Sequence, residues 1–252
     1  MATPRVLIIR APGTNCDYET SVAFEKAGAR VSTAHINQLI NDGLKIGDYQ
    51  ALVFPGGFTY GDDLGAGKIM GSEIRIKLGE DIATFIKEGG LILGICNGFQ
   101  VMVKSGILPG DGKIVTLTGN DSGRFECRWV HLAANPRSRC VFTRGIERMY
   151  LPVANGEGKL VADQETFQTI DAALFYTDSF GNQPAAYPDD PSGSLNGIAG
   201  ICDETGRIFA LMPHPERHIS PHQHPGWTRG QSHDPGDGLK IFTNAVGWIK
   251  QL

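Results

Sequence analysis

The sequence predicts an α/β protein, built in three layers around a mostly parallel, doubly wound sheet, with extra antiparallel strands in the C-terminal half. Two observations lead to this prediction. Short apolar runs alternate with amphipathic segments through the first half of the 252-residue chain, whereas strand-like runs dominate the second half. Such alternation produces parallel strands covered by helices on both faces, with functional side chains at the carboxyl ends of the strands.

The first half supplies the parallel strands and their helices. Residues 6–9 form a short, continuously apolar run, which is typical of a central parallel strand. The amphipathic segment 18–27 is followed by Gly28, a residue type that commonly ends helices. By the same criteria we expect further strands over residues 30–34, 51–54 and 91–95, and further helices over residues 72–87 and 99–104.

The second half is expected to consist mainly of strands and to end in a helix over residues 237–252. Strands are predicted over residues 114–118, 124–133, 140–143, 150–153, 160–162, 172–176, 197–201 and 208–212, with a short helix over 167–173. Segments 178–196 and 217–236 are rich in turn-forming residues and are predicted to be loops. Neither has the character of a linker, so we expect a single domain over residues 1–252.

Composition argues against several classes of protein. The net charge is −4 and no basic block is present, which argues against nucleic acid or an anionic membrane surface as a partner. We expect neither a signal peptide nor a membrane span, because no apolar run approaches about 20 residues. The 5 cysteines are scattered without a CxxC pair, which is typical of reduced thiols in the cytoplasm rather than of disulfides or a zinc site.

Gly94, Cys96 and Gly98 form the most informative motif, because they follow the apolar run over residues 91–93. A strand that ends in a sharp, glycine-flanked turn and continues as a helix is the pattern of a nucleophile elbow. The positive end of the following helix favours a thiolate and a nearby oxyanion. Buried cysteines are also common between strand and helix, so this motif alone leaves a catalytic and a structural role open.

His214 and Glu216 follow the apolar run over residues 208–212. A thiol nucleophile needs a base, and the base needs an acceptor that fixes its tautomer. Residues two apart in an extended segment point the same way, so this pair can supply both. By itself the pair would be an ordinary loop histidine beside a solvated glutamate. Together with the elbow it predicts a catalytic triad of Cys96, His214 and Glu216.

A glycine-rich loop over residues 55–68 follows the strand predicted over residues 51–54. It fits neither GxxxxGK[ST] nor GxGxxG, so we do not expect a phosphate-binding loop. Glycine permits the close approach of a substrate, and a backbone N–H at such a turn suits a negatively charged oxygen. We therefore expect the N–H groups of Gly57 and Asn97 to form an oxyanion hole.

These motifs resemble the class I glutamine amidotransferases, which share the Gly-x-Cys-x-Gly elbow, the upstream Pro-Gly-Gly turn and the His-x-Glu near the C-terminus. More narrowly, the chain resembles the glutaminase subunits of phosphoribosylformylglycinamidine synthases. The blocks that carry the narrower resemblance are PGTNCD at 12–17, GGFTYGDDLGAG at 56–67, SGRFE at 122–126, NGEG at 155–158, GSLNGIAGIC at 193–202 and MPHPER at 212–217.

The resemblance implies a flavodoxin-like, class I glutaminase fold and hydrolysis of glutamine to glutamate and ammonia through a cysteine thioester. It also implies that Gln100, Asn155 and Gly156 bind glutamine, although relatives commonly carry histidine where this chain has Asn155. The ammonia would serve a separate synthetase subunit, with a small accessory subunit, for the ATP-dependent conversion of formylglycinamide ribonucleotide to formylglycinamidine ribonucleotide in purine biosynthesis. ATP and Mg²⁺ are expected in that partner, and no cofactor or metal is expected in this chain.

Other functions and sites remain as alternatives. The segment over residues 217–236 carries four histidines, at positions 218, 222, 224 and 233, but prolines interrupt it, so we expect a solvated loop rather than a metal site. A γ-glutamyl hydrolase or peptidase would share the elbow and the His-x-Glu motif. A non-catalytic scaffold subunit would keep the fold without needing the triad.

Overall fold

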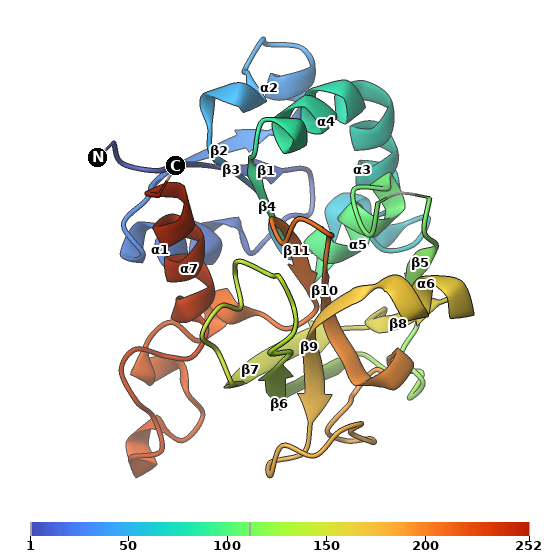
Figure 1. Ribbon diagram of the computed structural model, residues 1–252, viewed down its shortest axis with the longest axis vertical. Helices are drawn as coiled ribbons and strands as arrows, with labels where there is room; N and C mark the ends of the chain where they lie inside the picture. The colour runs from blue at the N-terminus through green and yellow to red at the C-terminus, as the bar shows by residue number, and fades with distance from the viewer. Residues whose placement is uncertain (1, 111, 252) are drawn as a thin grey trace.

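A nine-stranded sheet runs through the computed structural model, which describes residues 2–110 and 112–251 (Figure 1). The strands lie in the order β2-β1-β3-β4-β11-β10-β9-β6-β7. Their bounds are β1 (Arg5–Arg10), β2 (Arg30–His35), β3 (Ala51–Phe54), β4 (Leu91–Ile95), β6 (Glu126–Ala134), β7 (Arg148–Asn155), β9 (Asp171–Thr177), β10 (Ile198–Cys202) and β11 (Ile208–Leu211). The pairings from β2 to β11 are parallel and those from β11 to β7 are antiparallel. The predicted α/β fold class is therefore confirmed.

Helices cover both faces of the parallel half of the sheet (Figure 1). On one side, α1 (Asp17–Lys26) packs against α7 (Leu239–Ile249) through an edge-to-face contact of Phe24 with Phe242, with ring centroids 4.9 Å apart. On the other side lie α3 (Lys68–Glu73), α4 (Gly79–Lys87) and α5 (Asn97–Ser105). Strands β3 and β4 are buried along their whole length, which explains their continuous apolar sequence.

The remaining elements are short. Strands β5 (Val115–Thr118) and β8 (Lys159–Ala162) form a separate antiparallel pair. Helix α6 (Gln164–Thr169) lies a few residues earlier in the chain than the predicted short helix, because β9 already begins at Asp171. Helix α2 (Ile36–Ile40) was not predicted; the side chain of His35 caps it by accepting a hydrogen bond from the Asn37 N–H.

Two predicted elements differ in the structure. The helix predicted over residues 72–87 begins at Lys68, and a π-helical segment, Ile74–Leu78, divides it into α3 and α4. A π-helical turn carries an extra residue, so it shifts the helix face without changing the apolar composition. The strand predicted over residues 140–143 is instead a buried turn, whose apolar side chains serve the core: Phe142 packs on Phe209, with centroids 5.5 Å apart. The last residue of the predicted C-terminal helix, Leu252, lies outside the described residues.

The antiparallel half of the sheet curls back toward the parallel half. Although β7 and β11 are not neighbours in the sheet, the N–H of His214, just after β11, donates to the carbonyl oxygen of Pro152 in β7 at 2.8 Å. This contact brings the end of β7 to the carboxyl ends of β4 and β11. It therefore places residues from both halves of the chain around one point.

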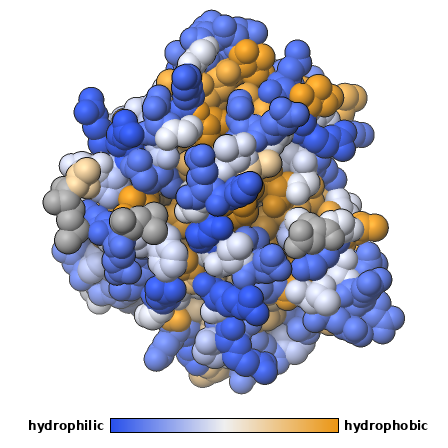
Figure 2. Space-filling view, turned by 45° about the horizontal axis from the view of Figure 1, so that its top comes forward, coloured by the Kyte–Doolittle hydropathy of each residue, from blue (hydrophilic) through white to orange (hydrophobic). Residues whose placement is uncertain are grey.

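The outer surface contrasts with the apolar core. Figure 2 shows a face on which hydrophilic side chains predominate, with apolar side chains gathered in smaller areas between them. Across residues 2–110 and 112–251, none of the helices combines the length and the apolar character needed to cross a membrane.

Candidate active site

Cys96 lies at a strained turn between β4 and α5. Its backbone has φ +51° and ψ −107°, a conformation that non-glycine residues rarely adopt and that concentrates at functional sites. The turn is held because the Cys96 N–H donates to the carbonyl oxygen of Leu211 at 2.8 Å. Gly98 is required behind it, since a Cβ there would overlap the carbonyl oxygen of Phe54. The local geometry is that of a nucleophile elbow.

His214 and Glu216 form a buried pair just beyond β11. The Nδ1 atom of His214 lies 2.6 Å from Oε1 of Glu216, and the side chains are 2% and 0% exposed. The short turn Pro215–Arg217 places the carboxylate beside Nδ1, at the edge of the ring. Nε2 of His214 is buried and has no hydrogen-bond partner in the described part of the chain, so this nitrogen is available to a substrate or a nucleophile.

The surroundings of His214 favour its protonated form. Burial alone would lower the pKa of the imidazole, but attraction to Glu216 and Cys96 outweighs burial, and contacts with the Cys96 and Cys16 thiols add to it. The pKa of His214 therefore lies well above its ordinary value. The ring can hold a proton at neutral pH and supply it to a leaving group.

The structure brings the three predicted triad residues together. The Cys96 thiol, 5% exposed, lies near enough to His214 to help raise the pKa of its ring, and the sulfur lies 3.6 Å from the carbonyl oxygen of Ala154 in β7. A thiol near an imidazole that is paired with a carboxylate is the set of groups that a thiol nucleophile requires.

Gly57 and Asn97 are the residues whose N–H groups are predicted to form the oxyanion hole. Gly57 has φ +148°, and a Cβ on it would be 2.8 Å from atoms of Gly13, Thr14 and Asn15. Within residues 2–110 and 112–251, neither the Gly57 N–H nor the Asn97 N–H donates to a protein acceptor. The Asn97 side chain fixes the neighbouring loop, because its Oδ1 accepts from the Thr59 hydroxyl at 2.7 Å.

The three residues predicted to bind glutamine differ in their free hydrogen-bonding capacity. Asn155, at the end of β7, is 3% exposed, and neither polar atom of its side chain has a partner among the described residues. Gln100 is engaged at both ends: Oε1 accepts from Asn97 Nδ2 at 2.8 Å, and Nε2 donates to the Glu157 carbonyl at 2.7 Å. The Gly156 carbonyl accepts from the Asn120 N–H at 3.0 Å.

Comparison with known proteins identifies the family of the chain. Residues 3–249 match the CobB/CobQ-like glutamine amidotransferase domain. Phosphoribosylformylglycinamidine synthase subunit PurQ of Dehalococcoides mccartyi is 56% identical over the whole of both chains. The chain belongs to the PurQ family of glutamine amidotransferases.

Two further relatives agree with this assignment. PurQ of Methanococcus maripaludis is 43% identical over 98% of each chain. One chain of the structure of PurLQS from Thermotoga maritima superposes with a TM-score of 0.77 at 31% identity, covering 98% of this chain and 100% of that one. The expected class I glutaminase fold and the expected family are therefore both confirmed.

Sequence reasoning missed three groups that the structure places around the triad. These are the thiol of Cys16, the guanidinium of Arg217 and the carbonyl of Ala154. Cys16 and Arg217 lie within motifs that mark the family, yet nothing in their spacing reveals a contact with His214. The carbonyl of Ala154 lies near Cys96 only because β7 curls back toward the parallel half of the sheet. No local sequence pattern predicts this curl.

The histidine-rich segment is mostly exposed, as expected of a solvated loop, but His218 departs from that expectation. His218 is buried, its Nδ1 lies 2.8 Å from the carbonyl oxygen of Tyr150, and its ring packs on Trp129 with centroids 5.1 Å apart. The part of the segment around His218 therefore packs on β6 and β7. The prolines of the segment prevent a regular helix, but they do not prevent the side chains between them from packing against the sheet.

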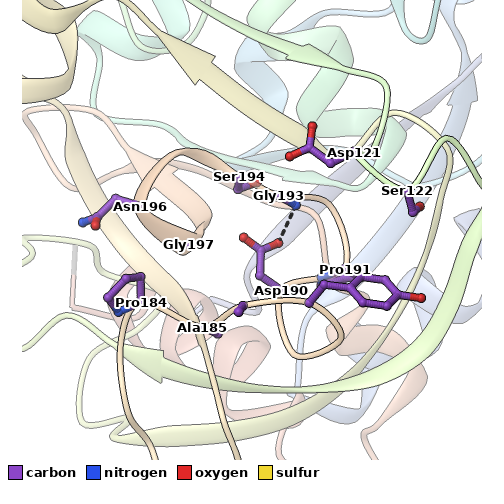
Figure 3. Close-up of a pocket in the computed structure, with 12 residues that line it drawn as sticks. Asp121, Ser122, Pro184, Ala185, Asp190, Pro191, Gly193, Ser194, Asn196 and Gly197 are labelled. Atoms are coloured by element: carbon purple, nitrogen blue, oxygen red, sulfur yellow. Dashed lines mark hydrogen bonds between the residues drawn. The ribbon is translucent and has the colours of Figure 1, made fainter.

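A separate cavity of about 520 Å³ lies beside the loop over residues 184–197 (Figure 3). Asp190 points into this region and accepts a hydrogen bond from the Gly193 N–H at 3.0 Å. No triad residue lines this cavity. The hydroxyl of Ser194 donates to the Gly158 carbonyl at 3.3 Å, so the loop supports the chain segment that follows Asn155.

Proposed function

We propose that the chain is the glutaminase subunit that hydrolyses glutamine through a thioester on Cys96 and supplies the ammonia for synthesis of formylglycinamidine ribonucleotide. One observation carries this proposal: a strained cysteine at a strand–helix elbow lies near a buried, hydrogen-bonded His–Glu pair, close enough to raise the pKa of the histidine. Membership of the PurQ family supports the same reaction.

The first half of the reaction forms the thioester. His214 takes the proton of the Cys96 thiol, the thiolate attacks the side-chain amide carbon of glutamine, and the carbonyl oxygen becomes an oxyanion. The free N–H groups of Gly57 and Asn97 stabilise that charge. Protonated His214 then gives its proton to the amide nitrogen, the C–N bond breaks and ammonia leaves.

The second half releases glutamate. Neutral His214 removes a proton from water, which attacks the thioester carbon, and the same two N–H groups stabilise the second oxyanion. The C–S bond breaks, His214 returns its proton to sulfur, and the enzyme is regenerated. Glu216 keeps the ring in one tautomer and stabilises the imidazolium in both halves.

We assign substrate binding to the last residue of β7 and the residue that follows it. The unpaired amide of Asn155 offers one donor and one acceptor to the amino-acid end of glutamine, and Gly156 leaves room beside it. Gln100 acts by holding Asn97 and Glu157 in place, with its remaining donor and acceptor capacity available to the substrate.

The ammonia is consumed elsewhere. A separate synthetase subunit, with a small accessory subunit, would bind ATP and Mg²⁺ and amidate formylglycinamide ribonucleotide in the cytoplasm. The PurLQS assembly of the Thermotoga maritima relative supports a multi-subunit enzyme. In this proposal residues 1–252 act as one glutaminase domain within that assembly.

The experiment that tests this function compares nitrogen donors. The chain is mixed with the synthetase and accessory subunits of its own organism, and formation of formylglycinamidine ribonucleotide is followed with glutamine, with ammonium chloride or with a γ-glutamyl peptide. We expect activity with glutamine and ammonium, and Cys96→Ala to abolish only the glutamine reaction. Faster turnover of γ-glutamyl peptides than of glutamine would instead assign a γ-glutamyl hydrolase.

A further inference from the structure

Cys16 is a buried thiol that the proposed reaction does not use. Cys16 lies immediately before α1 and is 1% exposed. Its S–H donates to the Asn15 side-chain oxygen at 3.1 Å, and its sulfur accepts a hydrogen bond from Nη2 of Arg217 at 3.1 Å. Because the thiol both donates and accepts a hydrogen bond, it is held in one orientation.

This thiol packs directly against the His214–Glu216 pair. A Cβ on Gly56 would lie 2.8 Å from Cε1 of His214 and 3.0 Å from the Cys16 sulfur. The edge of the imidazole ring and the sulfur therefore both pack against Gly56. The sulfur, a ring nitrogen of His214 and a carboxylate oxygen of Glu216 all lie within 4.8 Å of one another. The three side chains form one buried cluster.

The same residue links three separate segments of the chain. The N–H of Cys16 donates to the Gly56 carbonyl at 3.2 Å, which ties it to the loop that carries Gly57. Arg217, bonded to the sulfur, also donates from Nε to Glu19 of α1 at 2.7 Å. Movement of Cys16 would therefore disturb the base and the oxyanion donor together.

We infer that Cys16 is a positioning residue, whose thiol holds the His214 imidazole and the Glu216 carboxylate in the orientation that serves Cys96. Its soft sulfur fills the space beside the ring and accepts hydrogen bonds only weakly, so it does not displace Glu216 from Nδ1. This inference rests on the proposed glutaminase function.

The charges around the ring support this role. Burial raises the pKa of the Cys16 thiol, which keeps it protonated and unreactive at neutral pH. The charged and titratable groups that face His214 are Glu216 on its own turn, Cys96 at the elbow and Cys16 before α1, with Arg217 on the far side of Cys16. Loss of the Cys16 contact removes one of the groups that stabilise the imidazolium.

The test uses Cys16→Ala and Cys16→Ser in the complex with the synthetase, and Cys140→Ala as the matched control, because Cys140 is another buried free thiol. The kcat and KM for glutamine are measured across the pH range, with ammonia-dependent amidation as the control for folding and docking.

We expect Cys16→Ala to lower kcat by roughly 10- to 100-fold and to shift the alkaline limb of kcat to lower pH. Cys16→Ser should lie between Cys16→Ala and the wild type, and ammonia-dependent activity should be unchanged.

Two results would overturn the inference: a wild-type pH profile and kcat in Cys16→Ala, or a loss of activity with the alkaline limb unmoved, which would indicate support of the fold alone. If Cys16→Ala does not fold, the same shift, or its absence, in Cys16→Ser decides the question. Cys96→Ala is run in parallel. If Cys96→Ala keeps glutamine-dependent activity, the proposed function itself is rejected. If Cys96→Ala loses this activity while Cys16→Ala has the kcat and pH profile of the wild type, only the positioning role of Cys16 is rejected.

Discussion

At the scale of single residues, free hydrogen-bonding capacity separates groups that meet the substrate from groups that hold the site together. Both polar atoms of the Gln100 side chain are bonded to the protein, whereas those of Asn155 are buried without a partner. A buried, unpaired amide costs about 1–3 kcal/mol, so its retention suggests a ligand that completes it. The same reasoning applies to Nε2 of His214.

Asn155→Ala should weaken glutamine binding with little effect on folding. We expect the KM for glutamine to rise about tenfold, which corresponds to roughly 1.4 kcal/mol, because hydrogen bonds to the substrate are lost. The free energy of unfolding should not fall, since no protein hydrogen bond is removed and the burial of an unpaired amide is relieved. Gln100→Ala is the contrasting variant and should lower the unfolding free energy. An unchanged KM in Asn155→Ala would exclude the proposed contact.

Glu216→Gln should change the pH dependence of the glutaminase reaction. Attraction to Glu216 helps to hold the pKa of His214 well above its ordinary value, so the imidazolium persists through neutral pH and is lost only on the alkaline side. Removal of the carboxylate charge lowers that pKa, and the alkaline limb of kcat should move to lower pH. We also expect kcat to fall by about 10⁴-fold, as in serine proteases that lose the third triad residue. Profiles of kcat against pH for both proteins provide the measurement, and coincident alkaline limbs would count against the assigned pair.

At the scale of elements, apolar runs predicted most of the parallel strands within a residue or two. Strands β3 and β4 coincide with their predicted bounds, because both faces are buried and every position is apolar. Composition alone cannot separate a buried turn from a buried strand, which is why residues 140–143 were assigned wrongly. It also cannot reveal the π-helical segment Ile74–Leu78, because that segment changes the hydrogen-bond spacing and not the apolar pattern.

Packing of α5 against β3 depends on Gly98. A Cβ at this position would overlap the carbonyl oxygen of Phe54, a backbone atom that cannot move aside. We expect Gly98→Ala to lower the free energy of unfolding by about 3 kcal/mol or more and to abolish the glutaminase reaction. Gly247→Ala is the matched control, because Gly247 also lies in a helix, α7, and a Cβ there meets nothing within 4 Å. The control should be stabilised by roughly 0.5–1 kcal/mol, as measured by denaturant unfolding.

At the scale of the whole molecule, the site depends on the curl of the sheet. Residues at the end of β7 and residues at the elbow are far apart in the chain, yet the Ala154 carbonyl lies 3.6 Å from the Cys96 sulfur. The residue pattern predicted the elbow and the His–Glu pair, because each is a local motif at a strand end. The glutamine-binding assignments came only from the family resemblance, since no local pattern predicts which antiparallel strand returns to the site.

The proposed assembly predicts that the isolated chain is a poor glutaminase. The proposed triad and oxyanion donors all belong to this chain, but ammonia released without an acceptor subunit would be wasted, so we expect the synthetase with bound nucleotide to raise kcat for glutamine. Glutamate release is measured with the chain alone and with the complete complex. Equal turnover in the two samples would contradict the coupling.

The central claim is that Cys96, and no other thiol, forms the covalent bond with glutamine. A chloroketone that mimics glutamine provides the most direct measurement, with the modified peptide located by mass spectrometry. We expect one equivalent on Cys96, protection by added glutamine, and no labelling of Cys96→Ala. Labelling of Cys16 in place of Cys96, or the absence of any glutamine-protected adduct, would contradict the account.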